Sequence, residues 1–565
     1  YIGEPTPYQS RNSFFGQIDT AGFPKDAYYF YQSVWTDAKT NPMIHILPYW
    51  DFNPGQIIDV RVYTNAPKAA LFFNDTLIGE KKLAHTQEDN IIADWSLPYK
   101  KGVLTAIAYD EFGNEIARDT KHSFCDASSL RLSADRLEVP ANGEELIFVT
   151  IDALDADGYP VDNANNRVHV TVEGEGLLAG LDNGDSTDYE PYKGDCRRLF
   201  SGKLLAIIAP TLNAGTITVT ASSDGLKDAV LTLNTVACKN RDSDDLHIMT
   251  ITRDPLADAV SHATDIPVRS ITLSCEDSCI LTANKPSTVI SAATHPANAA
   301  AQLLDWKVTN AEGVVVPYAT LERIDDTHMR ILAFADGSFF VRCSVTNGRG
   351  YTVLYSMLEF KAEQIGTMNL DPYSFTVGSL YSDSEGEIAN GNAHGAATGS
   401  EGTTSITYGP FDFGLFGSDT VTIPIFETES RPVDLTFIEG KTKTQPGTVL
   451  CRGHYDKKMI WDTYQEESFK LPKRLTGVTT FTIQVTNRKL HIGGLSFKKL
   501  EKAWSPLSVT DIDRVYGDAF CKTDDAITGI GNNVTIEYTD MDFGERTCVV
   551  IEITGRSPIE KNTIH

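Results

Sequence analysis

Three aromatic side chains that could bind a sugar lie close together in one polar stretch of the sequence, residues 454–464. They are Tyr455, Trp461 and Tyr464. Exposed aromatic rings stack on the apolar faces of pyranose rings, while neighbouring polar groups bind the sugar hydroxyls. The stretch is therefore a candidate carbohydrate-binding site. Since a β-domain can carry such residues for packing alone, a purely structural role is the interpretation that the sequence favours.

The sequence contains no other pattern with the spacing of a catalytic motif. It has no nucleophile elbow, phosphate-binding glycine loop, dinucleotide motif or histidine-rich metal helix. The acidic turn 155–158 suggests calcium, but Asn166 stands where an EF-hand loop begun there would need glutamate. We interpret it as a hairpin turn, and the acidic stretch 181–188 as a solvated turn. No metal site is predicted.

The nine cysteines are scattered along the chain, and only Cys275 and Cys279 are close in sequence. No histidine or second cysteine pair completes a zinc-binding spacing. Free thiols are the favoured interpretation, and a disulfide between these two residues is the alternative.

Length and charge limit the classes of protein that this chain can belong to. Its 565 residues exceed a single core and predict about four to six domains. The net charge of −27 argues against nucleic acid or an anionic membrane surface as a partner. No run of apolar residues approaches the length that membrane insertion needs.

The first thirty-six residues predict the end of a strand, a loop and a helix. Pro24 stands at a plausible first helical position and Asp26 in the first turn. Tyr28, Tyr31 and Trp35 follow at helical spacing and form one apolar stripe. This is one βα unit without a partner strand nearby to complete a sheet.

Two sequence runs carry a resemblance to a known family. They are Tyr-Ile-Gly-Glu-Pro-Thr-Pro-Tyr at 1–8 and Gly-Gln-Ile-Asp-Thr-Ala-Gly-Phe-Pro-Lys-Asp-x-Tyr-Tyr-x-Tyr-Gln-Ser-x-Trp at 16–35. Together they resemble the last βα unit of the catalytic TIM barrel of glycoside hydrolase family 2, in its bacterial β-galactosidase-like branch. The remaining chain resembles the accessory β-domains that follow the barrel in that branch.

The resemblance implies that the catalytic glutamates belong to earlier barrel strands, before Tyr1, so no catalytic residue is expected in this chain. Retaining hydrolysis needs two carboxylates roughly 5–5.5 Å apart, and Glu4 alone cannot supply them. Tyr1, Glu4 and Thr6 lie where the rim of a barrel active site would fall. A structural Gly-Glu-Pro turn is the favoured alternative for these residues.

The predicted fold class is mostly β: tandem immunoglobulin-like sandwiches and jelly-roll carbohydrate-binding-like modules, preceded by the remnant of a TIM barrel. Strand-like runs separated by Asn, Asp and Gly turns support this class. The predicted domains are residues 1–36 (last βα unit), 37–126 and 127–238 (immunoglobulin-like sandwiches), 239–266 (linker), 267–363 (bacterial immunoglobulin-like domain), 364–500 (complete jelly roll) and 501–565 (incomplete second jelly roll).

An internal repeat supports the two jelly rolls. Each copy has a strand, an aromatic-Asp-Phe-Gly or Met-Asp-Phe-Gly turn and a second strand, which is 420–426 in the first copy and 548–553 in the other. The pattern resembles family 6-like carbohydrate-binding modules, in which a structural calcium is possible. Because the later strands of the second copy are unaccounted for, we expect the chain to be truncated at both ends.

The function that this resemblance implies is that of the C-terminal part of a secreted or cell-surface bacterial β-galactosidase, which hydrolyses terminal β-D-galactosyl residues with retention. This chain alone is predicted to be inactive. Expected partners are carbohydrate and the missing catalytic portion, and no cofactor is expected. Two alternatives stay open: a β-glucuronidase as the parent enzyme, and a non-catalytic, adhesin-like glycan-binding scaffold.

Overall fold

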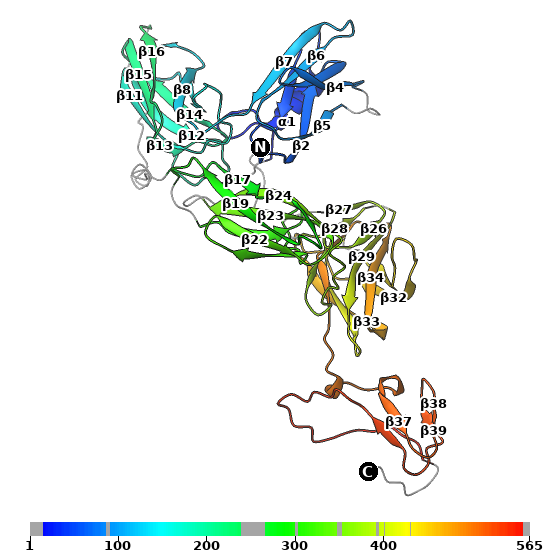
Figure 1. The fold of residues 1–565 in the computed structure, drawn as a ribbon. Coiled ribbons are helices and arrows are strands. Elements are labelled where there is room, and N and C mark those ends of the chain that lie inside the picture. Colours follow the sequence, from blue (N-terminus) through cyan, green and yellow to red (C-terminus); the bar gives the residue numbers. More distant parts are fainter. Residues whose placement is uncertain are drawn as a thin grey trace. The chain divides into compact units, whose positions relative to one another are not determined.

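The structure, a computed structural model, describes residues 15–85, 91–238, 266–299, 303–346, 353–390, 395–400, 402–429 and 431–557. The described chain is nearly all β, as predicted (Figure 1). It divides into two compact units, Tyr1–Thr309 with Pro317–Ile365, and Asn310–Val316 with Gly366–His565. The candidates Tyr1, Glu4 and Thr6 and most of the predicted linker lie outside the described residues.

A two-sheet sandwich follows the N-terminal helix in the first unit. Its sheets have the orders β1-β2-β5 and β4-β3-β6-β7. The elements are α1 (Asp26–Trp35), β1 (Ile44–Leu47), β2 (Ile57–Thr64), β3 (Lys68–Phe73), β4 (Thr76–Lys82), β5 (Ala93–Pro98), β6 (Val103–Tyr109) and β7 (Glu115–His122). In β2 the alternate residues Ile58, Val60 and Val62 are buried, as expected for a strand that faces a core on one side.

Helix α1 contacts this sandwich through a face that differs from the predicted stripe. Tyr29 stacks on His45 with ring centroids 3.9 Å apart, Phe30 meets Tyr63 at 5.4 Å, and Ser33 is buried. The apolar stripe predicted from Tyr28, Tyr31 and Trp35 is exposed instead, and the Trp35 side chain is 77% accessible. An amphipathic stripe usually packs against a core, so this aromatic face of α1 has no such packing within the described residues.

The second sandwich has sheets in the orders β12-β14-β10-β8 and β13-β11-β15-β16-β9. Its strands are β8 (Ser129–Ala134), β9 (Glu138–Pro140), β10 (Ile147–Leu154), β11 (Arg167–Gly174), β12 (Gly176–Asp182), β13 (Cys196–Arg198), β14 (Lys203–Pro210), β15 (Gly215–Ser222) and β16 (Ala229–Val236). The apolar run 146–151 forms most of β10, and Ile147, Val149 and Ile151 alternate into the core.

The third sandwich has sheets in the orders β17-β19-β22-β21 and β18-β24-β23-β20. Its strands are β17 (Ser270–Cys275), β18 (Ile280–Thr282), β19 (Ser287–His295), β20 (Asp305–Thr309), β21 (Ala319–Arg323), β22 (His328–Ala333), β23 (Gly337–Thr346) and β24 (Val353–Glu363). Phe339 and Phe360 stack inside this sandwich with ring centroids 5.7 Å apart and are fully buried.

The second unit contains a jelly roll of two facing sheets. The larger has the order β25-β36-β30-β35-β28-β27, with β33 paired to β30, and the smaller has the order β26-β29-β34-β31-β32. The strands are β25 (Thr376–Val377), β26 (Asp383–Glu385), β27 (Ile388–Asn390), β28 (Ala397–Gly399), β29 (Thr403–Asp412), β30 (Ser418–Glu427), β31 (Val433–Glu439), β32 (Thr448–Tyr455), β33 (Gln465–Leu475), β34 (Val478–Thr486), β35 (Leu490–Ile492) and β36 (Gly494–Phe497).

The last part of the second unit has only short strands. They are β37 (Arg514–Tyr516), β38 (Cys521–Lys522), β39 (Ile527–Thr528) and β40 (Thr535–Glu537), preceded by the 3-10 turns Lys502–Trp504 and Val509–Asp511. The strand expected at 548–553 is not formed, and Val549, Val550 and Ile551 are 77–85% exposed. The residues are β-prone, but a strand also needs a pairing partner, and none of the described strands supplies one.

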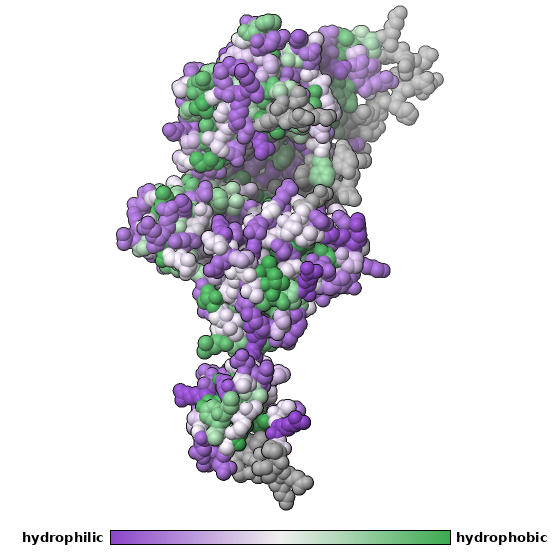
Figure 2. Space-filling view, turned by 90° about the vertical axis from the view of Figure 1, so that its right-hand side faces the viewer, coloured by the Kyte–Doolittle hydropathy of each residue, from purple (hydrophilic) through white to green (hydrophobic). Residues whose placement is uncertain are grey.

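Hydrophilic residues dominate the face of the molecule shown in Figure 2, with apolar residues scattered among them. This distribution fits the strongly negative net charge of the chain. In the part of the chain that the structure describes, no helix combines the length and the apolar character needed to cross a bilayer.

Candidate functional site

The three aromatic residues singled out in the sequence have different environments in the jelly roll. Trp461 lies in the β32–β33 loop with 73% of its surface exposed. Tyr464, at the end of the same loop, is half-buried. Tyr455 is 2% exposed and belongs to the hydrophobic core. Only Trp461 therefore presents a free ring face to solvent.

Assigning Tyr455 to a binding loop was wrong. The residue is the last of strand β32, and its side chain points between the two sheets. Its hydroxyl donates to the carbonyl oxygen of Ile425 at 3.4 Å, and burial raises the pKa of this phenol. Strand alternation places residue 455 on the core side, which the polar stretch after it concealed.

Two residues that the sequence analysis missed, Phe426 and His491, complete an aromatic patch with Trp461 and Tyr464. The Phe426 ring centroid lies 5.9 Å from that of Trp461 and 5.8 Å from that of Tyr464. His491 meets the same phenylalanine ring at 5.1 Å. We call these four residues the aromatic patch; β30, the β32–β33 loop and β35 position them.

Strand alternation explains why the aromatic patch lies on the outer face of the larger sheet. In β30, Val421, Ile423 and Ile425 point into the core, so Phe426 points away from it. An aromatic residue out of phase with the core pattern was the sequence signal that could have revealed this position. His491 lies likewise between the core residues Leu490 and Ile492.

The aromatic patch has an uncharged polar group suited to sugar hydroxyls. His491 Nδ1 and Thr398 Oγ1 are 2.8 Å apart and share a hydrogen bond. Burial, helped by nearby Lys489, lowers the pKa of this imidazole, so the ring is neutral at pH 7. A neutral imidazole can donate or accept a hydrogen bond, and the exposed ring of Trp461 supplies a stacking surface.

A buried ion pair fixes the end of β30 beside the aromatic patch. Glu427, which follows Phe426, is 2% exposed and forms a salt bridge with Arg488. Arg488 also bonds Glu429 at 3.1 Å and the carbonyl oxygen of Arg431 at 2.7 Å. This bracing holds the strand end from which the Phe426 ring projects.

The acidic turn at 155–158 of the second sandwich is closed by hydrogen bonds to its own backbone. The Asp155 carboxylate, 2% exposed, accepts backbone N–H groups of Asp157, Tyr159 and Cys125, which confirms the hairpin-turn interpretation. Within the described ranges, no three His, Cys, Asp or Glu side chains converge as metal ligands would. A structural calcium in a jelly roll stays a prediction.

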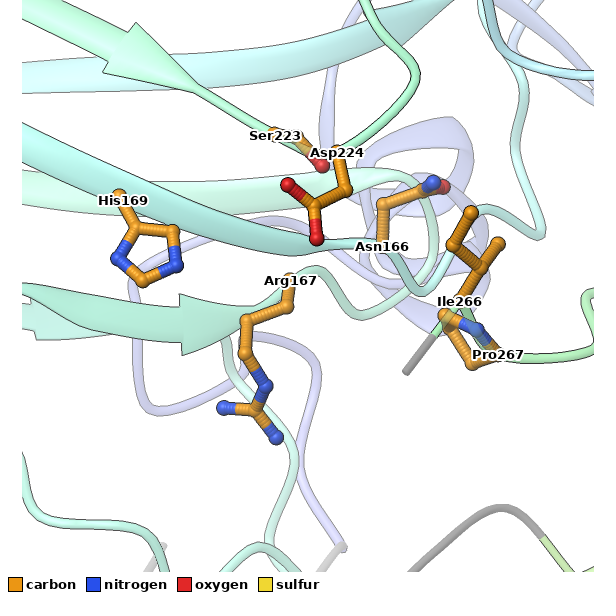
Figure 3. A pocket seen from close by; sticks show the side chains of 7 residues that line it. All are labelled: Asn166, Arg167, His169, Ser223, Asp224, Ile266 and Pro267. Carbon is orange, nitrogen blue, oxygen red and sulfur yellow. The ribbon is translucent and has the colours of Figure 1, made fainter. Parts of the chain in front are cut away.

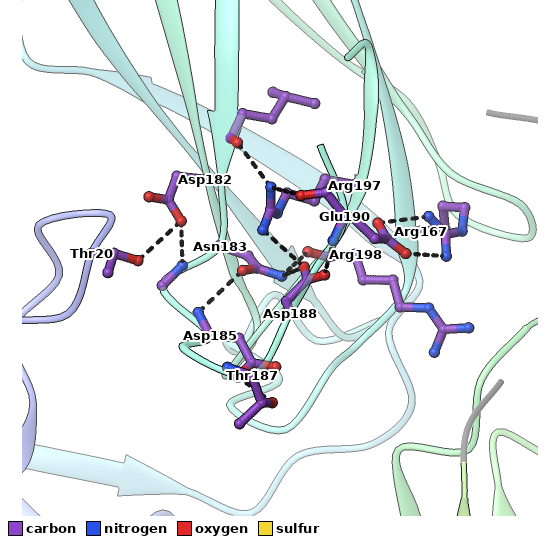
Figure 4. Close-up of polar contacts among 12 residues, drawn as sticks. Thr20, Arg167, Asp182, Asn183, Asp185, Thr187, Asp188, Glu190, Arg197 and Arg198 are labelled. Carbon is purple, nitrogen blue, oxygen red and sulfur yellow. Dashed lines mark hydrogen bonds and ion pairs between the residues drawn. The ribbon is translucent and has the colours of Figure 1, made fainter. Parts of the chain in front are cut away.

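The stretch 182–190 is a buried, cross-braced loop, so its interpretation as a solvated turn was wrong (Figure 4). Asn183 is 2% exposed, and Arg167 binds Glu190 through two hydrogen bonds of 2.8 and 3.0 Å. Arg197, which is fully buried, lies 3.1 Å from Asp188. Charged residues can be buried here because each finds an opposite charge.

The same loop contacts the segment that precedes helix α1. Thr20 donates a hydrogen bond to Asp182 at 3.2 Å (Figure 4). Asp19 lies so close to Gly184 that a Cβ there would be 2.2 Å from its carboxylate. These residues precede α1, so the loop before the helix is held against the second sandwich.

Two hollows in the second sandwich lack the features of a glycosidase active site. The first, lined by residues that include Arg167, His169 and Asp224, has about 10 Å³ of room, about enough for one water (Figure 3). The second has about 330 Å³ and is lined by Leu177, Pro210 and their neighbours without any carboxylate.

The fold thus defines a class: a chain of β-sandwich modules with a jelly roll that carries an aromatic patch. A model of the glycoside hydrolase family 2 C-terminal domain 5 matches residues 130–232, and a model of a domain of unknown function matches residues 55–117. These ranges coincide closely with strands of the second and the first sandwich. The second sandwich is therefore similar to a C-terminal domain of glycoside hydrolase family 2.

Several relatives are known. The chain is 40% identical over 237 residues to the β-galactosidase BoGH2A of Bacteroides ovatus, covering 41% of this chain and 27% of that enzyme. It is 34% identical over 192 residues to a putative β-glucuronidase of Formosa agariphila, covering 33% of this chain and 18% of that protein. A solved β-glycosidase from Bacteroides vulgatus is 33% identical, covering 40% of this chain and 29% of that one, with a TM-score of 0.38. The matches therefore span less than a third of each relative's length.

Proposed function

We propose that this chain is the C-terminal, accessory part of a secreted or cell-surface bacterial β-galactosidase of family 2. The parent enzyme would hydrolyse terminal β-D-galactosyl residues with retention. The observation that carries this proposal is the 40% identity over 237 residues to an enzyme named as a β-galactosidase. Helix α1 and the segment before it, bonded to the two sandwiches through His45 and Asp182, support it as the attachment point of a barrel.

We place the catalytic carboxylates outside residues 1–565. Retaining hydrolysis needs two carboxyl groups roughly 5–5.5 Å apart on either side of the scissile bond. Of the two hollows described above, one has a single acidic residue, Asp224, and the other has none. The exposed aromatic face of α1, with Tyr31 and Trp35, would be covered by the rest of the barrel.

The activity of the isolated chain tests this placement. Purified residues 1–565 should show no turnover of an aryl β-D-galactoside above the rate without protein, because the proposal places the carboxylate pair outside them. A longer protein that joins a family 2 catalytic barrel to this chain should hydrolyse the same substrate. Turnover by the 565-residue chain itself would overturn the placement of the catalytic pair.

A β-glucuronidase is the second candidate, because a putative β-glucuronidase is 34% identical over 192 residues. The two activities differ in whether the enzyme recognises a carboxylate on the sugar. Comparing aryl galactoside and aryl glucuronide as substrates of the longer protein decides between them. A kcat/KM ratio that favours the glucuronide would replace the galactosidase assignment and leave the accessory role of this chain unchanged.

We further propose that the jelly roll binds carbohydrate through the aromatic patch. Trp461 offers an exposed ring, the Phe426 ring contacts it at a right angle, and His491 supplies a neutral polar group. This arrangement combines a stacking surface with a hydrogen-bonding group, as sugar recognition requires.

Replacing Trp461 by alanine should weaken binding of β-1,4-galactan or lactose about 10-fold, because burying an aromatic face is worth about 1.5 kcal/mol or more. Isothermal titration calorimetry would measure the dissociation constants. Tyr455→Phe should leave affinity unchanged, since its hydroxyl makes only a 3.4 Å contact in the core. Tyr516→Ala, an exposed tyrosine outside the jelly roll, is a second control. Equal affinities for the wild type and Trp461→Ala would leave the jelly roll with a structural role.

A further inference from the structure

Cys275 and Cys279 lie on opposite sides of a short connection between the two sheets of the third sandwich. Cys275 ends β17, which pairs with β19, and Cys279 immediately precedes β18, which pairs with β24. Three residues, 276–278, cross from one sheet to the other. A covalent bond between the two cysteines would therefore join the sheets at this corner.

Backbone hydrogen bonds fix both ends of this crossing. The amide of Glu276 donates to the carbonyl oxygen of Val289 at 3.1 Å, and the amide of Lys361 donates to that of Cys279 at 2.9 Å. A salt bridge of 2.9 Å between Lys285 and Asp277 crosses the exposed side of the turn. The two thiols are thus positioned by neighbouring strands and not by a free loop.

The two thiols are hydrogen-bonded to each other and half-buried. The Cys275 sulfur also lies 3.4 Å from Thr288 Oγ1 and 3.3 Å from the carbonyl oxygen of Ser278. The hydrogen bond from Cys279 lowers the pKa of Cys275 below that of an ordinary thiol, while the same contact raises the pKa of Cys279. One member of the pair is therefore an activated nucleophile and the other its neutral hydrogen-bond donor.

We propose that Cys275 and Cys279 form a redox-active dithiol that closes to a disulfide bond between the sheets of the third sandwich. A low-molecular-weight disulfide such as oxidised glutathione is the oxidant. The Cys275 thiolate attacks one sulfur of the oxidant, forming a mixed disulfide and releasing one glutathione thiolate. Cys279 then loses its proton, attacks the Cys275 sulfur and releases the second glutathione. Two protein thiols are oxidised and one oxidant disulfide is reduced to two thiols.

Formation of the mixed disulfide at Cys275 makes Cys279 more reactive. Once Cys275 is in the mixed disulfide it no longer carries the negative charge whose hydrogen bond raised the pKa of Cys279. Cys279 can then ionise and act as the resolving thiol. Its place directly across the crossing keeps it within reach of the Cys275 sulfur.

Other cysteines of the chain provide a contrast within the same molecule. Cys196 and Cys343 are buried, and burial raises their pKa values to about 11 and about 12. They are inert at neutral pH because the thiolate, and not the thiol, reacts with disulfides. Cys521 is a free, exposed cysteine and serves as a comparison for simple uptake of glutathione.

The experiment treats the reduced 565-residue chain with oxidised glutathione at pH 7, alkylates the remaining thiols after acid quenching, and maps peptides by mass spectrometry without reduction. The peptide that contains Cys275 and Cys279 should become lighter by two hydrogens and carry neither alkyl group nor glutathione. Reduction should restore alkylation at both sites. A peptide that stays doubly alkylated, or that retains glutathione at Cys275 beside a free Cys279, would overturn the proposal.

Two variants separate the roles of the thiols. Cys279→Ser should leave a persistent glutathione adduct on Cys275, since the resolving thiol is gone. Cys275→Ser should abolish the disulfide and leave any glutathione that Cys279 takes up as a persistent adduct, since no second thiol remains to resolve it. Cys521→Ser, at an exposed site elsewhere, should leave bond formation unchanged. Absence of a glutathione adduct on Cys275 in Cys279→Ser would contradict the assigned order of attack.

Discussion

Replacing Arg197 by methionine should lower the free energy of unfolding of the second sandwich by about 3–5 kcal/mol, the usual cost of breaking a buried ion pair. The guanidinium is fully buried and donates to the carbonyl oxygen of Glu190 at 3.0 Å. It also lies 3.1 Å from Asp188 and 4.6 Å from the centre of the Tyr192 ring. Methionine fills much of the space but leaves the Asp188 carboxylate, 12% exposed, without its cation.

Hydrogen exchange is the appropriate measurement for this variant, because a chain of several modules can unfold in more than one transition and a single midpoint would mix them. The slowest amides of β10 and β14 should exchange faster by the factor that corresponds to the lost stability. Arg136→Met is the matched control, since its two ion pairs in the same sandwich are about half exposed and worth at most about 1 kcal/mol. Equal acceleration in both variants would show that Arg197 contributes no more than a surface arginine.

A second substitution tests whether the unpaired Asp188 carboxylate causes the loss of stability in Arg197→Met. Adding Asp188→Asn to Arg197→Met should recover part of the lost stability, because the buried charge left behind is removed. The amide of Asn183, which donates to Asp188 at 2.8 Å, can then pair with a neutral acceptor. If the double variant is less stable than Arg197→Met, the loss comes from packing and not from the stranded carboxylate.

The sequence predicted the fold class correctly because the signals for β-structure are local. Alternating or continuous apolar runs, such as 146–151, specify a strand face without reference to distant residues. Turn residues between the runs mark where strands end. The run at 548–553 has the same local character, yet it forms no strand in the described residues, because strand formation also depends on a partner.

The candidate site was only partly predictable, since it depends on strand ends and on pairing over long sequence distances. Tyr455 changes from a loop to a core residue because β32 extends as far as that position. His491 reaches the patch because β35 pairs with β30, which places residue 491 opposite Phe426. Register of this kind cannot be derived from spacing alone.

The burial of loop 182–190 was also not predictable from the sequence, because it depends on ion pairs between residues far apart in the chain. A string of acidic residues indicates a solvated turn in most sequences, because carboxylates are costly to bury. Arg167 and Arg197 remove that cost, although Arg167 lies 23 residues from its partner Glu190. Composition reveals the charges, and only the fold reveals which of them meet.

Replacing Phe481 by alanine should lower the stability of the jelly roll by about 3–5 kcal/mol, as expected when a buried aromatic side chain leaves a cavity. Phe481 is fully buried on β34, with ring centroids 5.4 Å from Phe437 and 5.2 Å from Phe497. Both neighbours would lose an aromatic contact. Calorimetry should show the jelly-roll transition lowered by about 10–20 °C, while the transitions of the first unit stay in place.

The same variant separates stability from recognition in the jelly roll. Phe481 lies between the two sheets, whereas Trp461 and Phe426 meet on the outer face of the larger one. Below its lowered transition, Phe481→Ala should therefore bind β-1,4-galactan or lactose with the affinity of the wild type. Phe481→Leu, which leaves a smaller cavity, should lose less stability and give the same affinity. A loss of affinity while the jelly roll is still folded would mean that the core determines the geometry of the patch, and the two faces of β30 could not then be treated as independent.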